Sequence, residues 1–142
     1  MIFKAGKYVI ADLCYVVPSE YWGELCEQWF PNAIQNNTEK DIVNYFDNNL
    51  DKNVECYALG TAHGDGTYID NIGNKYGVDA GIIGIIAYDD VRSELVDDNN
   101  VFDFESDFEV FSDNGILYFG NININTAYDD YEYSESLDDD NF

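Results

Sequence analysis

Residues 61–81, TAHGDGTYIDNIGNKYGVDAG, contain the only histidine of the chain, His63, with three aspartates and five of the eleven glycines. A histidine beside carboxylates could serve acid–base catalysis, and Asp65, Asp70 and Asp79 could together hold a hard cation. Their spacing reproduces no catalytic triad, no zinc motif and no EF-hand. Tight turns also require glycine and aspartate, so the segment favours turn chemistry. We therefore predict no enzymatic activity, no cofactor and no metal site, and cation binding by the three aspartates stays open.

The second chemical feature of the chain is its charge. Its 142 residues include 29 acidic and only 6 basic side chains, for a net charge of −23. This charge repels phosphate, which argues against direct binding of nucleic acid or an anionic membrane and favours a cationic partner. A hydrophobic content of 46% and 23 aromatic residues indicate a folded chain rather than a disordered one.

The cysteines and the apolar runs bear on the compartment. Cys14, Cys26 and Cys56 are odd in number and lack metal-type spacing, which predicts a reducing environment. The apolar run 8–17 is interrupted by Asp12 and is too short to span a bilayer, and no cleavage site follows a basic leader. We expect a cytoplasmic protein without membrane contact.

The first half of the chain predicts one strand and two helices. Residues 7–17 are rich in β-branched and aromatic side chains and predict a strand that ends at Pro18. Residues 19–30 carry an apolar stripe at helical spacing and predict a helix closed by Pro31. Residues 37–53 are ambiguous, and we interpret them as a short helix.

The second half predicts an antiparallel sheet. Residues 54–62 predict a strand, and a hairpin follows, in which 67–70 pair with 75–81. Residues 82–88 have the continuous apolar character of a central strand, and 89–100 predict an exposed acidic connection.

Residues 101–111 alternate strictly and predict one strand. Its apolar face carries Phe102, Phe104, Phe108 and Val110, and its polar face carries Asp103, Glu105, Asp107 and Glu109. A two-residue turn at 114–115 would place the phenylalanines beside asparagines of the next strand. We therefore predict a three-residue loop, Asp113 to Gly115, which pairs Phe104 with Ile124 and Val110 with Tyr118.

Together these elements predict a mainly β fold, an antiparallel sandwich or bent sheet with one packed α-helix; α+β is the alternative class. Residues 1–126 are expected to form a single globular domain. Residues 127–142 are acidic and lack an apolar period, so we expect a flexible tail.

Three segments carry a resemblance: ADLCYVV at 11–17, GDGTY at 64–68 and YGVDAGIIG at 76–84. The chain resembles an uncharacterised group of small acidic proteins from phages and bacteria whose members begin with a Gly-Asp-Pro-Cys-Tyr-like strand. The likeness covers roughly residues 6–86, and Ala11 and Leu13 stand where that group has glycine and proline. The resemblance implies a phage origin and carries no activity to this chain.

Residues 89–142 hold 17 acids and one base, so an electrostatic function belongs to this part. Acids at alternate strand positions lie about 6.6–6.8 Å apart on one face and could imitate the phosphates of DNA. We predict a DNA mimic that occupies the basic groove of a nucleic-acid-binding host defence protein, in the host cytoplasm if the chain is phage-encoded. The acids expected to meet that partner are Asp89, Asp90, Asp97, Asp98, Asp103, Glu105, Asp107, Glu109, Asp129, Asp130, Glu132 and Glu135.

Two other interpretations stay open. The acids could form a solvated face that keeps an edge hairpin soluble and blocks strand addition. Alternatively, Trp22, Tyr68 and Tyr76 could line an aromatic pocket for a small ligand such as a nucleotide, and the protein would then be a binding module or sponge.

Overall fold

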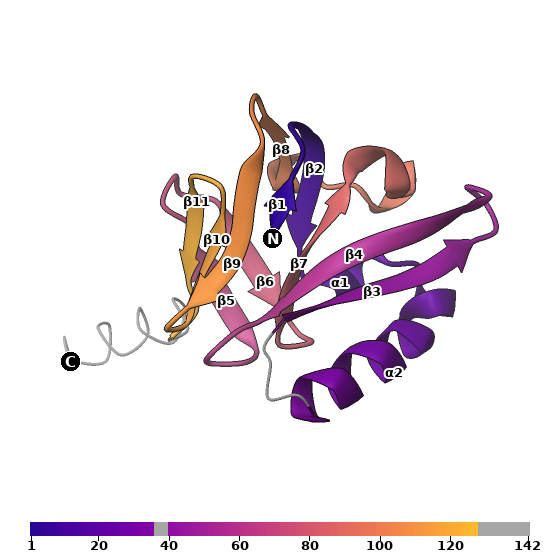
Figure 1. Cartoon of the computed structure of the whole chain (residues 1–142), viewed down its shortest axis with the longest axis horizontal. Coiled ribbons are helices and arrows are strands. Elements are labelled where there is room, and N and C mark those ends of the chain that lie inside the picture. Colours follow the sequence, from indigo (N-terminus) through magenta and orange to yellow (C-terminus); the bar gives the residue numbers. More distant parts are fainter. Residues whose placement is uncertain (36–39, 128–142) are drawn as a thin grey trace, which may run out of the picture.

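The computed structural model describes residues 1–35 and 40–127 (Figure 1). The helices are α1 (Leu13–Val16) and α2 (Ser19–Gln35), and three 3₁₀ turns follow later in the chain: η1 (Tyr88–Asp90), η2 (Ser93–Leu95) and η3 (Asp98–Asn100). The strands are β1 (Ile2–Phe3), β2 (Gly6–Ala11), β3 (Lys40–Asp47), β4 (Lys52–Gly60), β5 (Gly66–Ile69), β6 (Lys75–Val78), β7 (Ile82–Ala87), β8 (Val101–Phe104), β9 (Phe108–Asp113), β10 (Ile116–Phe119) and β11 (Ile122–Asn125).

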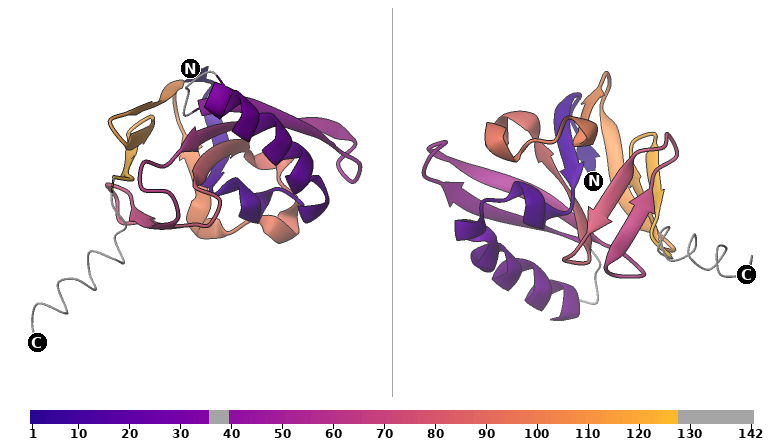
Figure 2. Two further views of the ribbon diagram at one scale, coloured as in Figure 1. Left: turned by 90° about the horizontal axis from the view of Figure 1, so that it is seen from below. Right: turned by 180° about the vertical axis from the view of Figure 1, so that it is seen from behind.

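All the strand pairs are antiparallel, and they form three sheets. The five-stranded sheet has the order β3-β4-β7-β2-β8, the four-stranded sheet β1-β9-β10-β11, and β5 and β6 form a separate hairpin. Figures 1 and 2 show α2 along one face of the five-stranded sheet, with the four-stranded sheet and the hairpin on the other side. The predicted class, mainly β with one packed helix, is confirmed.

The middle strand of the five-stranded sheet, β7, is buried on both faces, which explains its continuous apolar character. Alternate residues of β7 illustrate this: Ile82 and Ile86 join the core under α2, while Ile83 and Ile85 join the core under the four-stranded sheet. The predicted central strand is confirmed, because β7 is the middle strand of five. The predicted hairpin at 67–81 is also confirmed as β5 and β6.

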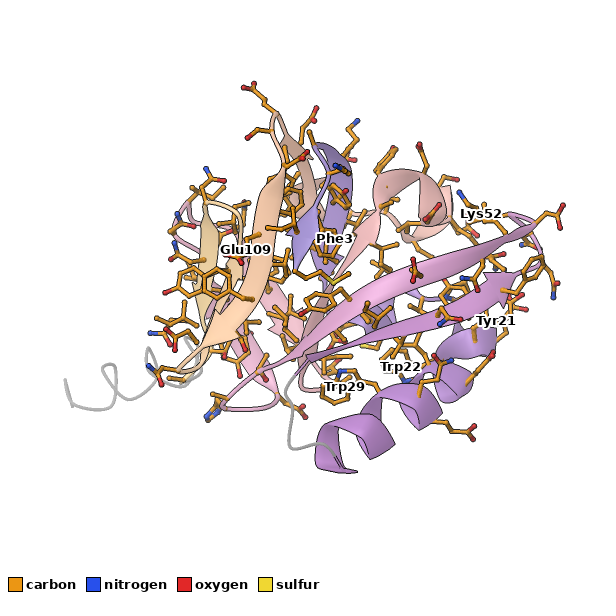
Figure 3. The ribbon with its side chains drawn as sticks, viewed as in Figure 1. Phe3, Tyr21, Trp22, Trp29, Lys52 and Glu109 are labelled. Atoms are coloured by element: carbon orange, nitrogen blue, oxygen red, sulfur yellow. The ribbon has the colours of Figure 1, made fainter. Side chains whose placement is uncertain are left out.

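Helix α2 packs through the predicted stripe but is longer than predicted. Leu25 and Trp29 are buried against the sheet, and Trp22 packs at the border of the same core (Figure 3). The predicted end at Pro31 is wrong, because the helix continues to Gln35. A proline removes one helical hydrogen bond, but a helix can continue through it.

The predicted helix at 37–53 is wrong: its described residues, from Lys40 on, form strand β3, the turn and the beginning of β4. Val43, Tyr45 and Asp47 are buried, while the residues between them are exposed. This alternation of period two is the pattern of a strand packed on one face. Ile42 and Phe46 lie on the exposed face. They are four residues apart in sequence, which is a spacing typical of the apolar face of a helix, and they therefore favoured the helical interpretation.

Strand β3 lies at the edge of the sheet, where α2 closes part of it. The side chain of Gln28 accepts a hydrogen bond from the N–H of Asn44 at 3.0 Å and donates one to its C=O at 2.7 Å. Farther along, the hydroxyl of Tyr21 accepts from the N–H of Asn48 at 3.1 Å. An amide side chain thus takes the place of a neighbouring strand at the middle of this edge.

The predicted first strand ends earlier than Pro18. Strand β2 stops at Ala11, and Asp12 caps the short helix α1 by accepting from the N–H of Cys14 at 3.0 Å. Asp12, in the middle of the apolar run, therefore marks the boundary between strand β2 and helix α1. Such capping is a common role of aspartate at the start of a helix.

The predicted single strand at 101–111 is wrong, because residues 105–107 turn the chain from one sheet into the other. Strand β8 pairs with β2, whereas β9 pairs with β1 and β10. Phe104 and Phe108 flank this turn, which we name the β8–β9 corner, and their rings stack with centroids 3.8 Å apart. Both rings enter the same core, so the alternating pattern persists across a break in the strand.

The predicted three-residue loop is also wrong. Strand β9 pairs with β10 through Asp113–Ile116 and Val110–Phe119, which leaves the two-residue turn Asn114-Gly115. Both turn residues have positive φ, 51° and 82°, as this turn type requires. The predicted clash of phenylalanines with asparagines does not arise, because β10 ends at Phe119 and the chain turns again before β11.

The acidic connection 89–100 is pinned to the sheet by Arg92. Its guanidinium donates two hydrogen bonds of 3.0 Å to Asp47, which is fully buried, and pairs with Glu20 at 3.0 Å. Burial raises the pKa of Asp47, but hydrogen bonds from Arg92, Leu50 and Asn49 outweigh it and hold that pKa below its ordinary value. Arg92, Asp47 and Glu20 therefore form one charged network that joins the connection 89–100 to strand β3 and to α2.

Two further expectations concern the chain as a whole. The predicted tail lies outside the described residues, apart from Ala127. Among the residues that the structure describes, no helix has both the length and the apolar character that a membrane crossing needs.

Candidate functional site

Eight of the twelve predicted partner-binding acids lie within the described residues, between 89 and 109; Asp129, Asp130, Glu132 and Glu135 lie outside them. Seven of the eight are exposed, and Asp90 is half-buried. Figure 1 shows the 3₁₀ turns and the β8–β9 corner on the same side of the molecule, its upper side in that view, while most of α2 lies on the lower side; Arg92 links the turns to the beginning of α2. We call the carboxylates of residues 89–109 the acidic end; their full list is Asp89, Asp90, Glu94, Asp97, Asp98, Asp103, Glu105, Asp107 and Glu109.

Sequence reasoning missed one member, Glu94. It is exposed in η2, between the predicted pairs 89–90 and 97–98. Its charge and its position in the predicted acidic connection were the signals that could have identified it.

Basic side chains contact part of the acidic end. Lys52, at the tip of the β3–β4 hairpin (Figure 3), pairs with Asp90, and Lys4 lies 3.6 Å from Asp107. Lys7 stands opposite Asp103 in the β2–β8 register. Within the described chain, Glu94, Glu105 and Glu109 form no ion pair. Lysines thus partly neutralise the acidic end at Asp90 and Asp107, whereas the charges of Glu94, Glu105 and Glu109 stay uncompensated.

The corner also forms a groove of about 470 Å³. Asp103, Glu105 and Asp107 border it together with Phe104 and Phe108, which are themselves buried. A group of carboxylates suits a guanidinium, which makes charge-assisted hydrogen bonds to them. The predicted ladder of four acids on one strand face is replaced by this curved arrangement across two sheets.

The glycine-rich segment 61–81 uses its aspartates for structure. Asp70 is buried, accepts from the N–H groups of Ile72 and Asn74 at 2.9 Å, and accepts from the hydroxyl of Tyr76 at 2.7 Å. The predicted turn chemistry is confirmed at this aspartate.

The other members of that segment do not converge with Asp70. Asp79 accepts from the hydroxyl of Tyr15, which raises the pKa of Tyr15 to about 12. Asp65 and His63 are exposed, and the backbone N–H of His63 donates to Thr126 at 2.8 Å. Over residues 1–35 and 40–127, no three side chains of histidine, cysteine, aspartate or glutamate are grouped as a metal site would require.

The predicted aromatic pocket is wrong. Tyr68 and Tyr76 are almost completely buried in the core beneath the four-stranded sheet, whereas Trp22 packs in the core beneath α2. The five-stranded sheet separates these cores, so the three rings cannot contact one ligand. Their aromatic character reflects packing on opposite faces of one sheet.

A different hollow does exist, which sequence reasoning missed. A cleft of about 530 Å³ lies where three distant segments meet, and its lining residues are Ala11, Asp12, Tyr15, Val16, Gly73, Asn74, Lys75, Tyr76, Gly77, Leu95, Asp97, Asn99 and Asn100. We call it the polar cleft. Its three segments, 11–16, 73–77 and 95–100, are separated by 56 and 17 residues and match no motif, so only the fold brings them together.

Asp12 organises one wall of the polar cleft. Its carboxylate is fully buried and accepts from the N–H groups of Cys14, Asp79 and Ala80 at 3.0, 2.7 and 2.8 Å. It therefore ties α1 to the segment after β6. Since its oxygens are committed to the backbone, Asp12 is a structural anchor of the cleft.

The structure thus offers two candidate surfaces, the acidic end and the polar cleft, which adjoin at Asp97 and η3. No family model, no curated protein and no solved structure matches this chain.

Proposed function

We propose that the chain is a non-enzymatic binding protein whose acidic end occupies the nucleic-acid-binding groove of a basic protein. The observation that carries the proposal is the concentration of nine carboxylates within residues 89–109, eight of them exposed, with Arg92 as the single base of that segment. Arg92 is directed to Asp47 and Glu20, so it neutralises none of these nine acids, although Lys52 pairs with Asp90 and Lys4 with Asp107.

The structure of the acidic end supports phosphate mimicry in three ways. The acids are held on short, anchored elements: Arg92 fixes the connection and Phe104 with Phe108 fix the corner. A rigid surface loses less conformational entropy on binding than a flexible one. The groove at the corner, finally, can take one arginine side chain of the partner between carboxylates.

The solvation interpretation is weakened by where the acids stand. A protective charge on an edge hairpin would lie along an open strand edge. Strand β9 instead pairs with strands on both sides, so Glu109 protects no free edge; among the acids of residues 103–109, Asp103 alone lies on an edge strand, β8. The resemblance to phage proteins makes a host defence nuclease in the cytoplasm the target class to test first.

The test measures displacement of a fluorescent DNA duplex from a sequence-independent bacterial DNA-binding protein and from a panel of defence nucleases. We expect the chain to displace DNA from at least one of them, and the affinity to fall at least about tenfold between roughly 50 and 200 mM salt. The variant Glu94→Gln/Asp98→Asn/Glu105→Gln/Glu109→Gln should lose most of this activity, because it removes four charges that no basic side chain of the described residues neutralises.

A matched control removes four charges elsewhere. Glu24, Glu27, Asp51 and Glu55 are exposed and lie on α2 and the β3–β4 hairpin. The variant Glu24→Gln/Glu27→Gln/Asp51→Asn/Glu55→Gln has the same net charge as the test variant and should bind normally. If both variants weaken binding equally, net charge rather than the acidic end is responsible, and mimicry is wrong.

A further inference from the structure

The polar cleft has an open strand edge as one of its walls. Strand β6 pairs only with β5, in a two-stranded sheet, so no strand of the described chain lies on its other side. The N–H of Asp70 donates to the C=O of Asn74, so these two residues form a hydrogen-bonded pair between the strands of the hairpin. In an antiparallel ladder, hydrogen-bonded pairs of residues alternate with pairs that are not hydrogen-bonded to each other. By this alternation, Lys75 and Gly77 direct their peptide groups away from β5, and both residues line the cleft.

Gly77 leaves this edge accessible. A Cβ atom placed on Gly77 would have no heavy atom within 4 Å, so the space beside its backbone is open. A glycine in a strand often marks a place where another molecule or backbone approaches closely. The N–H and C=O groups of residues 75 and 77 therefore present a donor and acceptor pattern to whatever enters the cleft.

The opposite wall carries amide side chains. Asn99 and Asn100 lie on η3, and a third amide, Asn74, lies on the β6 side, at the turn before that strand. Amides offer both a donor and an acceptor. The amide oxygen of Asn100 is buried and accepts no hydrogen bond from the described residues, so a donor brought to it would improve its energy.

The charges around the cleft select against anions. Asp97 is exposed at its border and Asp12 is buried in its wall, against one lysine, Lys75. The ring of Tyr15 is 50% exposed beside them and offers an apolar face. A ligand that fits is uncharged, partly aromatic and carries donors and acceptors side by side.

From this geometry we infer that the polar cleft binds a nucleoside through the edge of its base. A base presents adjacent donors and acceptors that match strand peptide groups and amides, and its ring can stack on a tyrosine. The volume of about 530 Å³ lies within the range of small-ligand sites. Phosphate is disfavoured, so nucleosides bind better than nucleotides.

The test is calorimetric titration of the full chain with adenosine, cytidine and AMP. We expect one nucleoside to bind at one site with a Kd below about 1 mM, which is the affinity expected of a few hydrogen bonds and one stacked ring. AMP should bind at least tenfold more weakly than adenosine if adenosine binds. Failure of both nucleosides to bind, or equal binding of AMP, would overturn the inference.

Two variants locate the ligand. Gly77→Val places two methyl groups in the open space and should weaken nucleoside binding more than tenfold, while a β-branched residue suits the strand. Asn99→Ala removes one exposed amide and is the second variant if Gly77→Val fails to fold. Gly23→Ala, on α2, also adds a Cβ in open space and should leave binding unchanged. Binding that survives both cleft variants would place the ligand elsewhere and refute this site.

Discussion

The contact between Gly84 and Leu13 provides the sharpest prediction for the core. Gly84 lies in the central strand β7 and is buried, and a Cβ there would be 2.6 Å from Cγ and 2.9 Å from Cδ1 of Leu13. Real Cβ atoms essentially never come within 3.0 Å of such a group, so the Gly84→Ala variant must displace Leu13. Leu13 is fully buried in α1 and has little room to move.

The magnitude follows from two opposed effects. Overpacking a core typically costs 1–3 kcal/mol, roughly, whereas replacing glycine by alanine lowers the entropy of the unfolded chain and returns about 0.4–1 kcal/mol. We expect Gly84→Ala to destabilise the protein by about 1–2 kcal/mol. Leu13→Ala should cost about 2–5 kcal/mol through the cavity that it leaves.

The double variant distinguishes this contact from independent effects. In Leu13→Ala/Gly84→Ala the new methyl group enters the space that Leu13 vacates, so the double variant should be more stable than the two single losses predict. We expect a coupling free energy of about 0.5–3 kcal/mol. Urea unfolding followed by circular dichroism measures all four free energies. A stable Gly84→Ala variant with additive losses would refute the reasoning.

Two predictions concern the wall of the polar cleft. Asp12→Asn should lower the free energy of unfolding by about 2–3 kcal/mol, because the amide replaces one accepting oxygen by a donor that faces backbone N–H groups. Urea unfolding measures this loss, and an unchanged midpoint would contradict the prediction. Burial, followed by the hydrogen bond with Asp12, raises the pKa of the Cys14 thiol to about 12. Since only the thiolate reacts, alkylation of Cys14 by iodoacetamide should be far slower in the folded protein than in urea at pH 8, and should rise only as the pH approaches 12. Mass spectrometry of the labelled peptide measures both rates; equal rates would show that the thiol is not held protonated.

The sequence predicted the parts of the fold that depend on local pattern. The apolar face of α2, the hairpin β5–β6 and the central strand β7 follow from periodicity and turn residues that act within a few positions. Asp70 followed from the same logic, since its partners Ile72, Asn74 and Tyr76 are near in sequence.

The errors arose where a distant contact decides the structure. Val43 and Tyr45 form a strand because α2 covers their face, and a helix could bury similar side chains in another way. The pattern at 101–111 alternates through the corner because Phe104 and Phe108 meet in one core from two sheets. The polar cleft was not predictable because its walls come from residues 11–16, 73–77 and 95–100, which only the folded chain assembles.

The glutamine on α2 that bonds to both peptide groups of Asn44 also limits how this protein can associate. For a second molecule to extend the five-stranded sheet at β3, it would first have to expel that side chain and leave its amide unsatisfied. The side chain of Gln28 therefore opposes fibre growth and strand exchange at this edge of the sheet, because it already occupies the hydrogen-bonding groups of Asn44. A protein with so many β-branched and aromatic residues can stay dispersed at this border without depending on charge alone.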